Sequence, residues 1–178
     1  MTQQKNNSTT LTIRQLDATD AVPFREVRLE GLHTHPESFS SSYDDERAEP
    51  LSSFEDWLEN SIVFGGYNEE NTLLGIASFI KPTMHKQCHK GKLTGIYVRP
   101  QARGTGLAKA LISQLIATHA EGVVEEILLT VGAFNAPAIT LYKSLGFKEY
   151  GLEKRALKVG DTYYDELLMA LPLNPTCK

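Results

Sequence analysis

The residues with the clearest chemical potential lie in one short stretch, IYVRPQARGTGLA, at positions 96–108. An apolar, β-type run ends at Val98, two glycines follow at Gly104 and Gly106, and an amphipathic helical pattern then begins. This order places free backbone N–H groups at a helix N-terminus, where phosphate oxygens bind readily. The glycines remove side chains where a ligand would approach the backbone, and Arg103 adds a positive charge. The stretch therefore predicts a site for a phosphate-bearing ligand.

Two familiar phosphate-binding motifs do not fit this stretch. A Walker loop needs a Lys-Ser/Thr pair directly after its second glycine, and none follows Gly106. The dinucleotide fingerprint needs Gly or Ala three positions after its second glycine, where this chain has Lys109. The spacing that remains, Gln101-x-x-Gly104-x-Gly106, resembles the acetyl-CoA signature of the GNAT family of N-acetyltransferases, Gln/Arg-x-x-Gly-x-Gly/Ala. The resemblance implies acetyl-CoA as the ligand.

A second stretch, NAPAITLYKSLGF at positions 135–147, resembles the second motif of the same family, Asn-x-x-Ala-x-x-Leu-Tyr-x-x-x-Gly-Phe. The two motifs occur in the family's order, and each falls on the expected kind of element. The segment 164–169, YDELLM, resembles a common last strand of the family. The likeness spans about residues 11–172, and on it the chain is identified as a member of the GNAT family.

The elements that must position these motifs follow from hydrophobic periodicity. Alternation and short apolar runs predict strands over residues 11–16, 62–67, 73–80, 92–98, 127–131, 147–153 and 163–171. Apolar residues at helical spacing predict helices over residues 20–32, 54–58, 108–116 and 136–145, with 33–50 as a loop or short helix. A strand, a helix and a strand in succession after residue 92 predict parallel pairing of 92–98 with 127–131.

The fold class that results is α/β (α+β), with a mixed, largely antiparallel central sheet and helices on both faces. The resemblance adds that the parallel pair is splayed, as in the acyl-CoA N-acyltransferase fold. Residues 11–172 are expected to form one N-acetyltransferase domain, between a disordered tail at 1–10 and a second tail at 173–178.

The resemblance also implies roles for particular residues. Main-chain groups exposed by the splay are implied to bind the pantetheine arm of coenzyme A. Backbone amides of the glycine turn are implied to bind its pyrophosphate. Tyr142 is the implied general acid, and Asn135 is implied to bond coenzyme A or an ordered water. The pantetheine group comprises Ile96, Tyr97 and Val98, and the pyrophosphate group Gln101, Arg103, Gly104, Thr105, Gly106, Leu107 and Ala108.

The implied reaction is direct transfer of an acetyl group to a primary amine of a small molecule or peptide. Many family members carry a glutamate on the strand before the glycine turn, but residues 93–97 contain no carboxylate. A base must then come from elsewhere, with Glu30, His33, His35 and Asp165 as candidates, or the amine must lose its proton to solvent. A non-catalytic acyl-CoA-binding or sensing module on the same fold is the alternative function.

Simpler interpretations accompany these roles. The glycine turn is also compatible with a tight connection, Asn135 with a helix cap and Tyr142 with a core aromatic. The acceptor's identity and the general base are not encoded in a recognisable motif.

Composition sets the remaining bounds. The chain has 178 residues and a formal net charge of −4, which gives no reason to expect a nucleic-acid partner. Five scattered histidines and two cysteines predict neither a metal site nor a disulfide framework. The N-terminus has no signal-peptide pattern and no apolar run reaches membrane-spanning length, so a cytoplasmic protein without membrane contact is expected. Members of the family are often dimers, and the resemblance alone therefore implies a homodimer.

Overall fold

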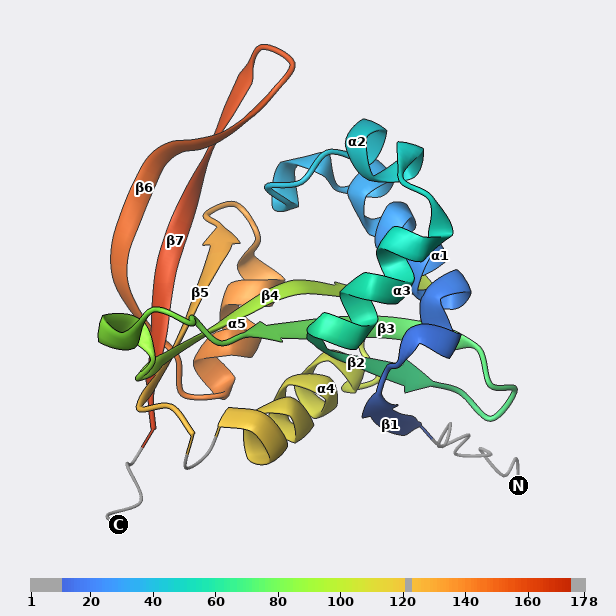
Figure 1. Ribbon diagram of the computed structural model, residues 1–178. Helices are drawn as coiled ribbons and strands as arrows, with labels where there is room; N and C mark the ends of the chain where they lie inside the picture. The colour runs from blue at the N-terminus through green and yellow to red at the C-terminus, as the bar shows by residue number, and fades with distance from the viewer. Residues whose placement is uncertain (1–10, 121–122, 174–178) are drawn as a thin grey trace, which may run out of the picture.

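The computed structural model describes residues 11–120 and 123–173, which fold around one central sheet (Figure 1). Over these residues the sheet has seven strands in the order β1-β2-β3-β4-β5-β7-β6. Only β4 and β5 pair in parallel, and every other neighbouring pair is antiparallel. The strands are β1 (Thr12–Gln15), β2 (Ile62–Tyr67), β3 (Leu73–Ile80), β4 (Lys90–Val98), β5 (Glu126–Gly132), β6 (Lys148–Val159) and β7 (Thr162–Pro172).

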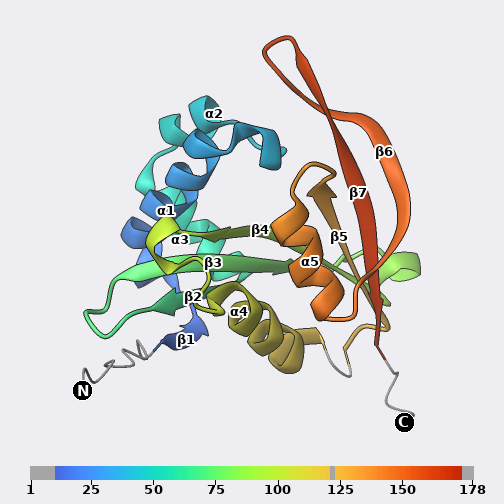
Figure 2. The same ribbon diagram turned by 180° about the vertical axis from the view of Figure 1, so that it is seen from behind.

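Helices cover both faces of the sheet (Figures 1 and 2). The first three precede β2 in the chain and the other two follow β4 and β5. They are α1 (Ala21–Thr34), α2 (Tyr43–Ala48), α3 (Leu51–Asn60), α4 (Leu107–Leu115) and α5 (Ala136–Ser144), and a π-helical turn, Ile116–Ala120, extends α4. These features confirm the fold class predicted from the sequence.

The strand alternation explains why the protein has two apolar cores, one on each face. In β2, Val63 packs with the core under α1 and α3, whereas Phe64 packs with the core under α4 and α5. In β3, Ile76 and Ala77 divide in the same way. Successive side chains of a strand point to opposite faces, so a strand covered on both sides is apolar at almost every position.

The splay of the parallel pair is visible in its register. β4 and β5 pair only where Lys90–Lys92 meets Glu126–Leu128, although both strands continue beyond. Figure 1 shows their far ends diverging. β4 also contains a bulge, since Gly95 and Ile96 together lie opposite the single β3 residue Ala77. Backbone groups near the bulge and the splay are therefore left without a strand partner on the β5 side.

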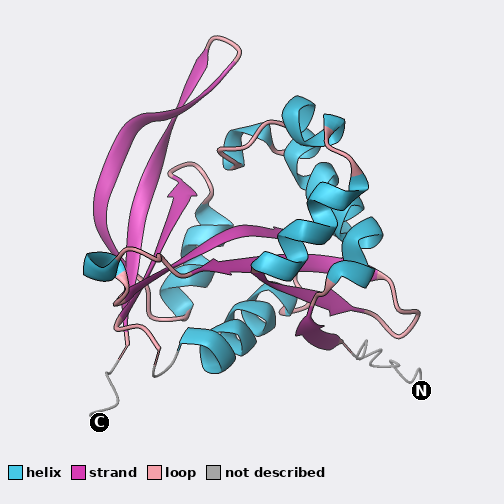
Figure 3. Ribbon diagram, in the orientation of Figure 1, coloured by secondary structure: helices cyan, strands magenta, loops and turns pink. Residues whose placement is uncertain are grey.

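The last hairpin differs from the sequence-based expectation. The strand predicted over 147–153 continues to Val159, so that β6 and β7 form the long projecting hairpin drawn in magenta in Figure 3. The strand continues because Arg155, at φ 57°, absorbs a register shift while its amide donates to Asp165 Oδ1 at 2.8 Å. The segment 33–50 agrees with the prediction of a loop or short helix, because it holds a 3-10 turn, η2 (Pro36–Ser38), and the short helix α2.

The expected tails lie almost wholly outside the described residues. Leu173 is the exception, and its amide donates to the carbonyl of Glu125 at 2.8 Å. Among the described residues, no helix is both long and apolar enough to cross a bilayer.

Candidate active site

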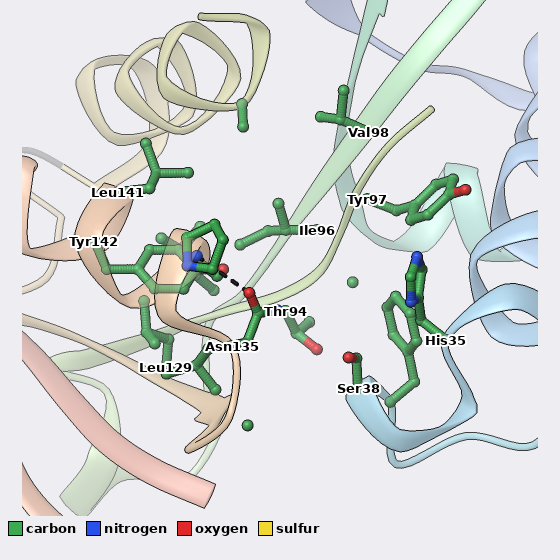
Figure 4. Close-up of a pocket in the computed structure, with 18 of the residues that line it drawn as sticks. His35, Ser38, Thr94, Ile96, Tyr97, Val98, Leu129, Asn135, Leu141 and Tyr142 are labelled. Carbon is green, nitrogen blue, oxygen red and sulfur yellow. Dashed lines mark hydrogen bonds between the residues drawn. The ribbon is translucent and has the colours of Figure 1, made fainter. Parts of the chain in front are cut away.

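A cavity of about 960 Å³ opens where β4 and β5 separate (Figure 4). In the close-up, Leu141 and Tyr142 reach it from α5, and His35 and Ser38 face it from the opposite wall. The unpaired part of β4 runs between these two walls. The cavity therefore brings together residues that are far apart in the sequence: the end of α1, the splayed strands, the glycine turn and α5.

The glycine turn forms one end of this cavity and has the local geometry predicted for it. β4 ends at Val98, and Gly104 and Gly106 adopt φ values of 76° and 85° before α4 begins at Leu107. A Cβ built on either glycine meets no atom within 4 Å, so the space beside the backbone is open. The first-turn amides of α4 have no partner within the helix, which leaves donors beside that space.

Most residues proposed to contact the cofactor line the cavity. They are Ile96, Tyr97, Val98, Arg103, Gly104, Gly106, Leu107, Ala108 and Asn135. The other two, Gln101 and Thr105, lie at the turn outside the lining. Thr105 donates from Oγ1 to the carbonyl of Ala102 at 2.7 Å and so braces the turn. The side chain of Tyr97 points into the core under α1, where its hydroxyl donates to Glu30 Oε1 at 2.9 Å.

Arg103 does not extend over the glycine turn. Its Nε donates to the carbonyl of Val98 at 3.1 Å, and its Nη2 lies 3.1 Å from His35 Nε2. The guanidinium carbon is 5.8 Å from the centre of the Tyr97 ring. In this conformation the positive charge joins the end of β4 to the end of α1.

Asn135 and Tyr142 come from the two ends of α5. The amide oxygen of Asn135 accepts a hydrogen bond from the Ala138 N–H at 3.2 Å, drawn dashed in Figure 4, so the residue caps the helix. Tyr142 is only 7% exposed and packs edge-on against Phe147. Its hydroxyl forms no hydrogen bond with any described residue, and burial raises its pKa to about 12.

Of the four candidate bases, only His35 lines the cavity. Glu30 is held by Arg99, whose Nε lies 2.9 Å from Glu30 Oε2, and by the Tyr97 hydroxyl. His33 stacks against Tyr43, with ring centres 4.8 Å apart. Asp165 accepts from the Arg155 amide, as described above. Glu30, His33 and Asp165 lie outside the cavity lining, and each is in contact with another residue.

Three carboxylates that were not predicted as site residues line the cavity: Glu37 of η2, Glu153 of β6 and Glu166 of β7. Glu37 lies 3.4 Å from His35 Nδ1, whereas the other two belong to the projecting hairpin. Burial is the main cause that raises the pKa of Glu166, and the charge of Glu153 raises it further, whereas Lys92 and the Thr130 hydroxyl act in the opposite direction. Strand alternation places Glu166 on the other face from Asp165. That alternation was the available signal, but the sequence alone does not say which face is the inner one.

No metal site accompanies these groups in the part of the chain that the structure describes, since no set of three His, Cys, Asp or Glu side chains is arranged to hold an ion.

Comparison with known proteins identifies the family to which the sequence belongs. The sequence profile of the Acetyltransferase (GNAT) family matches residues 28–147. The chain belongs to the GNAT family.

Individual relatives are similar over about half of the chain. An alanine N-acetyltransferase of ribosomal protein bS18 from Escherichia coli is 38% identical over 82 residues, which are 46% of this chain and 55% of the relative. An N-alpha-acetyltransferase from Sulfurisphaera tokodaii is 39% identical over 93 residues, 52% of each chain. The chain thus matches about half the length of these curated relatives.

Solved structures share the fold over nearly the whole chain. A GNAT acetyltransferase from Streptococcus pneumoniae superposes with a TM-score of 0.80 at 22% identity, covering 93% of this chain and 100% of that one. A Salmonella typhimurium protein solved with its cofactor acetyl-CoA gives a TM-score of 0.81 at 22% identity, covering 96% and 98%.

Proposed function

We propose that this protein is an acetyl-CoA-dependent N-acetyltransferase that transfers an acetyl group directly to a primary amine of a small molecule or peptide. The observation that carries the proposal is the splay of β4 from β5 into a cavity that also contains the glycine turn and the Tyr142 hydroxyl. One cavity thereby combines unpaired backbone, free helix N-terminal amides and a proton donor.

The residues present fit acetyl-CoA. Beyond Lys92, β4 has no β5 partner. Tyr97 pairs with Ile76 of β3, so the main-chain groups of Ile96 and Val98 are the ones that can pair with the amides of a pantetheine arm, as a sheet edge pairs with an extended peptide. The open space beside Gly104 and Gly106 admits the pyrophosphate to the α4 amides. When bound, acetyl-CoA supplies the activated acetyl group, and a β4 amide near the bulge can donate to the developing oxyanion.

Tyr142 acts in this scheme as the general acid. With a pKa of about 12 its phenol is protonated at neutral pH, and because no described residue accepts its hydrogen bond, the proton is available to a leaving thiolate in the cavity. Asn135 acts through its cap, which fixes the start of the helix that carries Tyr142.

The test is release of free thiol from acetyl-CoA against a panel of primary amines, run beside titration calorimetry of acetyl-CoA binding. The panel contains polyamines, amino acids, aminoglycosides and short peptides with an N-terminal alanine, the last because the Escherichia coli relative is named for such an acceptor. Turnover of at least one class, with the acetylated amine identified by mass spectrometry, is the expected result.

Acetyl-CoA binding without turnover of any amine would instead favour the non-catalytic acyl-CoA-binding module. Folded protein that does not bind acetyl-CoA would overturn the proposal itself.

A further inference from the structure

Two glutamates lie directly opposite one another on the wall of the cavity made by the projecting hairpin. Glu153 of β6 and Glu166 of β7 are Cα partners in the antiparallel register, so their side chains share a face. Both line the cavity. Like charges at such positions repel, and the repulsion costs stability unless a cation lies between or beside them.

The protein itself does not supply a full set of counter-charges. Neither glutamate forms an ion pair within the described residues. Among the described residues, Lys92 of β4 is the cation that lowers the pKa of Glu166, and it is a single charge against two. Arg28 also lines the cavity, but Glu46 neutralises it through two hydrogen bonds, of 2.9 Å from Nε and 2.6 Å from Nη2. Two further cations of the lining, Arg103 and Lys109, belong to the glycine turn and α4 rather than to the hairpin. The hairpin side of the cavity therefore has an excess of negative charge.

A second observation points to a ligand in the same space. Tyr142 is more than nine-tenths buried, lines the same cavity and has no hydrogen-bond partner among the described residues. The side chain is buried but its hydroxyl faces the open cavity, so a group that enters the cavity can form the hydrogen bond that the described residues do not supply. The acidic pair and the unpartnered hydroxyl thus face one cavity from different elements, β6–β7 and α5.

We propose that Glu166 is the catalytic base that accepts a proton from the acceptor's ammonium group, and that Glu153 makes the site selective for amines that carry additional positive charge. The inference rests on the proposed acetyl transfer and names its acceptor class: cationic primary amines, with diamines favoured over zwitterionic amino acids.

The protons and bonds balance as follows. Glu166 removes one proton from the ammonium group, and the neutral amine attacks the thioester carbonyl, forming the C–N bond. The C–S bond then breaks, and the leaving sulfur takes the proton of Tyr142. The surplus proton on the new amide nitrogen returns to the Tyr142 phenolate, and Glu166 releases its proton to solvent. The products are the acetylated amine, free coenzyme A and one proton, and no other reactant is needed.

The experiment compares three amines of one chain length and different charge: 1,4-diaminobutane, 4-aminobutan-1-ol and 4-aminobutanoate. Thiol release from acetyl-CoA by the full chain is measured for the wild type, Glu153→Gln and Glu166→Gln. In the wild type we expect kcat/KM to fall from the diamine to the amino alcohol to the zwitterion, by roughly tenfold a step. Glu153→Gln should reduce the differences in kcat/KM among the three amines. Glu166→Gln should lower kcat by roughly 100-fold for every amine.

Asp161→Asn is the matched control, because Asp161 is an exposed carboxylate in the turn of the same hairpin and does not line the cavity. It removes the same charge and should leave the order and kcat unchanged. An order that survives in Glu153→Gln would overturn the proposed selectivity, and a Glu166→Gln variant as fast as the control would overturn the base.

A pH profile separates a base from a merely structural glutamate. The groups facing Glu166 are Glu153 from β6, Lys92 from β4 and Thr130 from β5, while Glu37 of η2 contacts His35 Nδ1 at 3.4 Å. Because the base works only when ionised, kcat/KM should rise with pH through a pKa above the usual glutamate range. That limb should disappear in Glu166→Gln and persist in Glu153→Gln at lower pH.

If the wild type turns over none of the three amines, the same series is titrated calorimetrically into the complex with free coenzyme A. Binding in the predicted charge order, lost in the Glu153→Gln, Glu166→Gln double variant, supports the acceptor assignment, and absence of binding overturns it. A protein that does not bind acetyl-CoA at all contradicts the proposed function instead, so the two failures are distinguishable.

Discussion

Two groups of tyrosine and acidic side chains in this protein differ in whether their polar atoms have partners. The first joins Asp20, Arg14 and Tyr67 where the chain enters α1. Both carboxylate oxygens of Asp20 accept from Arg14, at 2.6 and 2.7 Å, and the Tyr67 hydroxyl donates to Asp20 Oδ1 at 2.9 Å. The Asp17 amide adds a further bond at 3.1 Å. Every oxygen of this carboxylate is satisfied inside the protein.

The second group, Tyr142 with Glu153 and Glu166, lines one cavity and, within the described residues, has no arginine bonded to its carboxylates. It has an unpartnered phenol and two facing carboxylates, and Lys92 is the cation that lowers the pKa of Glu166. Networks that are fully satisfied contribute to stability, whereas groups left without partners destabilise the fold and remain free to react. The presence or absence of hydrogen-bond partners therefore distinguishes a group that stabilises the fold from a group that is available for catalysis. Substitutions should therefore divide the same way, with stability lost at the first and rate lost at the second.

The largest expected effect is at the unpartnered phenol. Tyr142→Phe removes the proposed proton donor and should lower kcat by roughly 100-fold, about 2.7 kcal/mol of transition-state stabilisation, with acetyl-CoA affinity unchanged. Because the hydroxyl has no partner to lose, the free energy of unfolding should stay within about 0.5 kcal/mol of the wild type. Steady-state thiol release and urea unfolding measure the two quantities. An unchanged kcat would remove Tyr142 from the chemistry.

Substitution of Asp20, the paired carboxylate, should lower stability and leave kcat unchanged. Asp20→Asn leaves Arg14 without its charge partner and should reduce the free energy of unfolding by about 2 kcal/mol, less than for a fully buried pair because Arg14 is half-exposed. Chemical unfolding measures the loss, and the kcat of the folded variant should equal that of the wild type. A loss of kcat with stability intact would place Asp20 in the active site and contradict the comparison.

A smaller effect is expected at the paired phenol. Tyr67→Phe removes one hydrogen bond to a charged acceptor and should cost about 1.5 kcal/mol of stability without changing turnover. Thermal unfolding of Tyr67→Phe and Tyr142→Phe side by side gives the sharpest contrast between the groups. The account would be wrong if Tyr142→Phe were the less stable of the two.

The smallest effect is a pH dependence of the paired group. The hydrogen bonds from Arg14 hold the pKa of Asp20 below its usual range. A depressed pKa contributes stability that is present above the unfolded-state pKa, about 3.9, and is lost as pH falls through the folded-state value. The stability difference between wild type and Asp20→Asn should therefore shrink by about 0.3 kcal/mol between pH 7 and pH 4, and further below. Urea unfolding of both proteins at several pH values measures it, and a difference that grew in acid would contradict the sign.

Local sequence order was sufficient to predict the glycine turn and the elements around it. The end of β4 at Val98, the start of α4 at Leu107 and the Asn135 cap depend on neighbouring residues, so the sequence predicts them directly. The splay came from the family resemblance, and the register between β4 and β5 confirms it.

What could not be predicted depends on register and side-chain direction. Asp165 and Glu166 are adjacent, and the choice between them requires the pairing of β7 with β6, which shifts between Glu153 and Leu157. Arg103 follows the expected turn, but its side chain turns back to Val98 and His35 through contacts that no local pattern encodes. Contacts between residues far apart in the sequence determine both which of the two carboxylates faces the cavity and where the Arg103 side chain lies.

The central claim is that unpaired groups of the splayed strand and the glycine turn bind acetyl-CoA. Hydrogen exchange of individual backbone amides, measured by NMR with and without saturating acetyl-CoA, tests it most directly. We expect the amides of Ile96, Val98 and residues 104–108 to gain protection, while those of β1, already paired with β2, do not change. Acetyl-CoA that binds and leaves the amides of Ile96, Val98 and residues 104–108 unchanged would contradict the account.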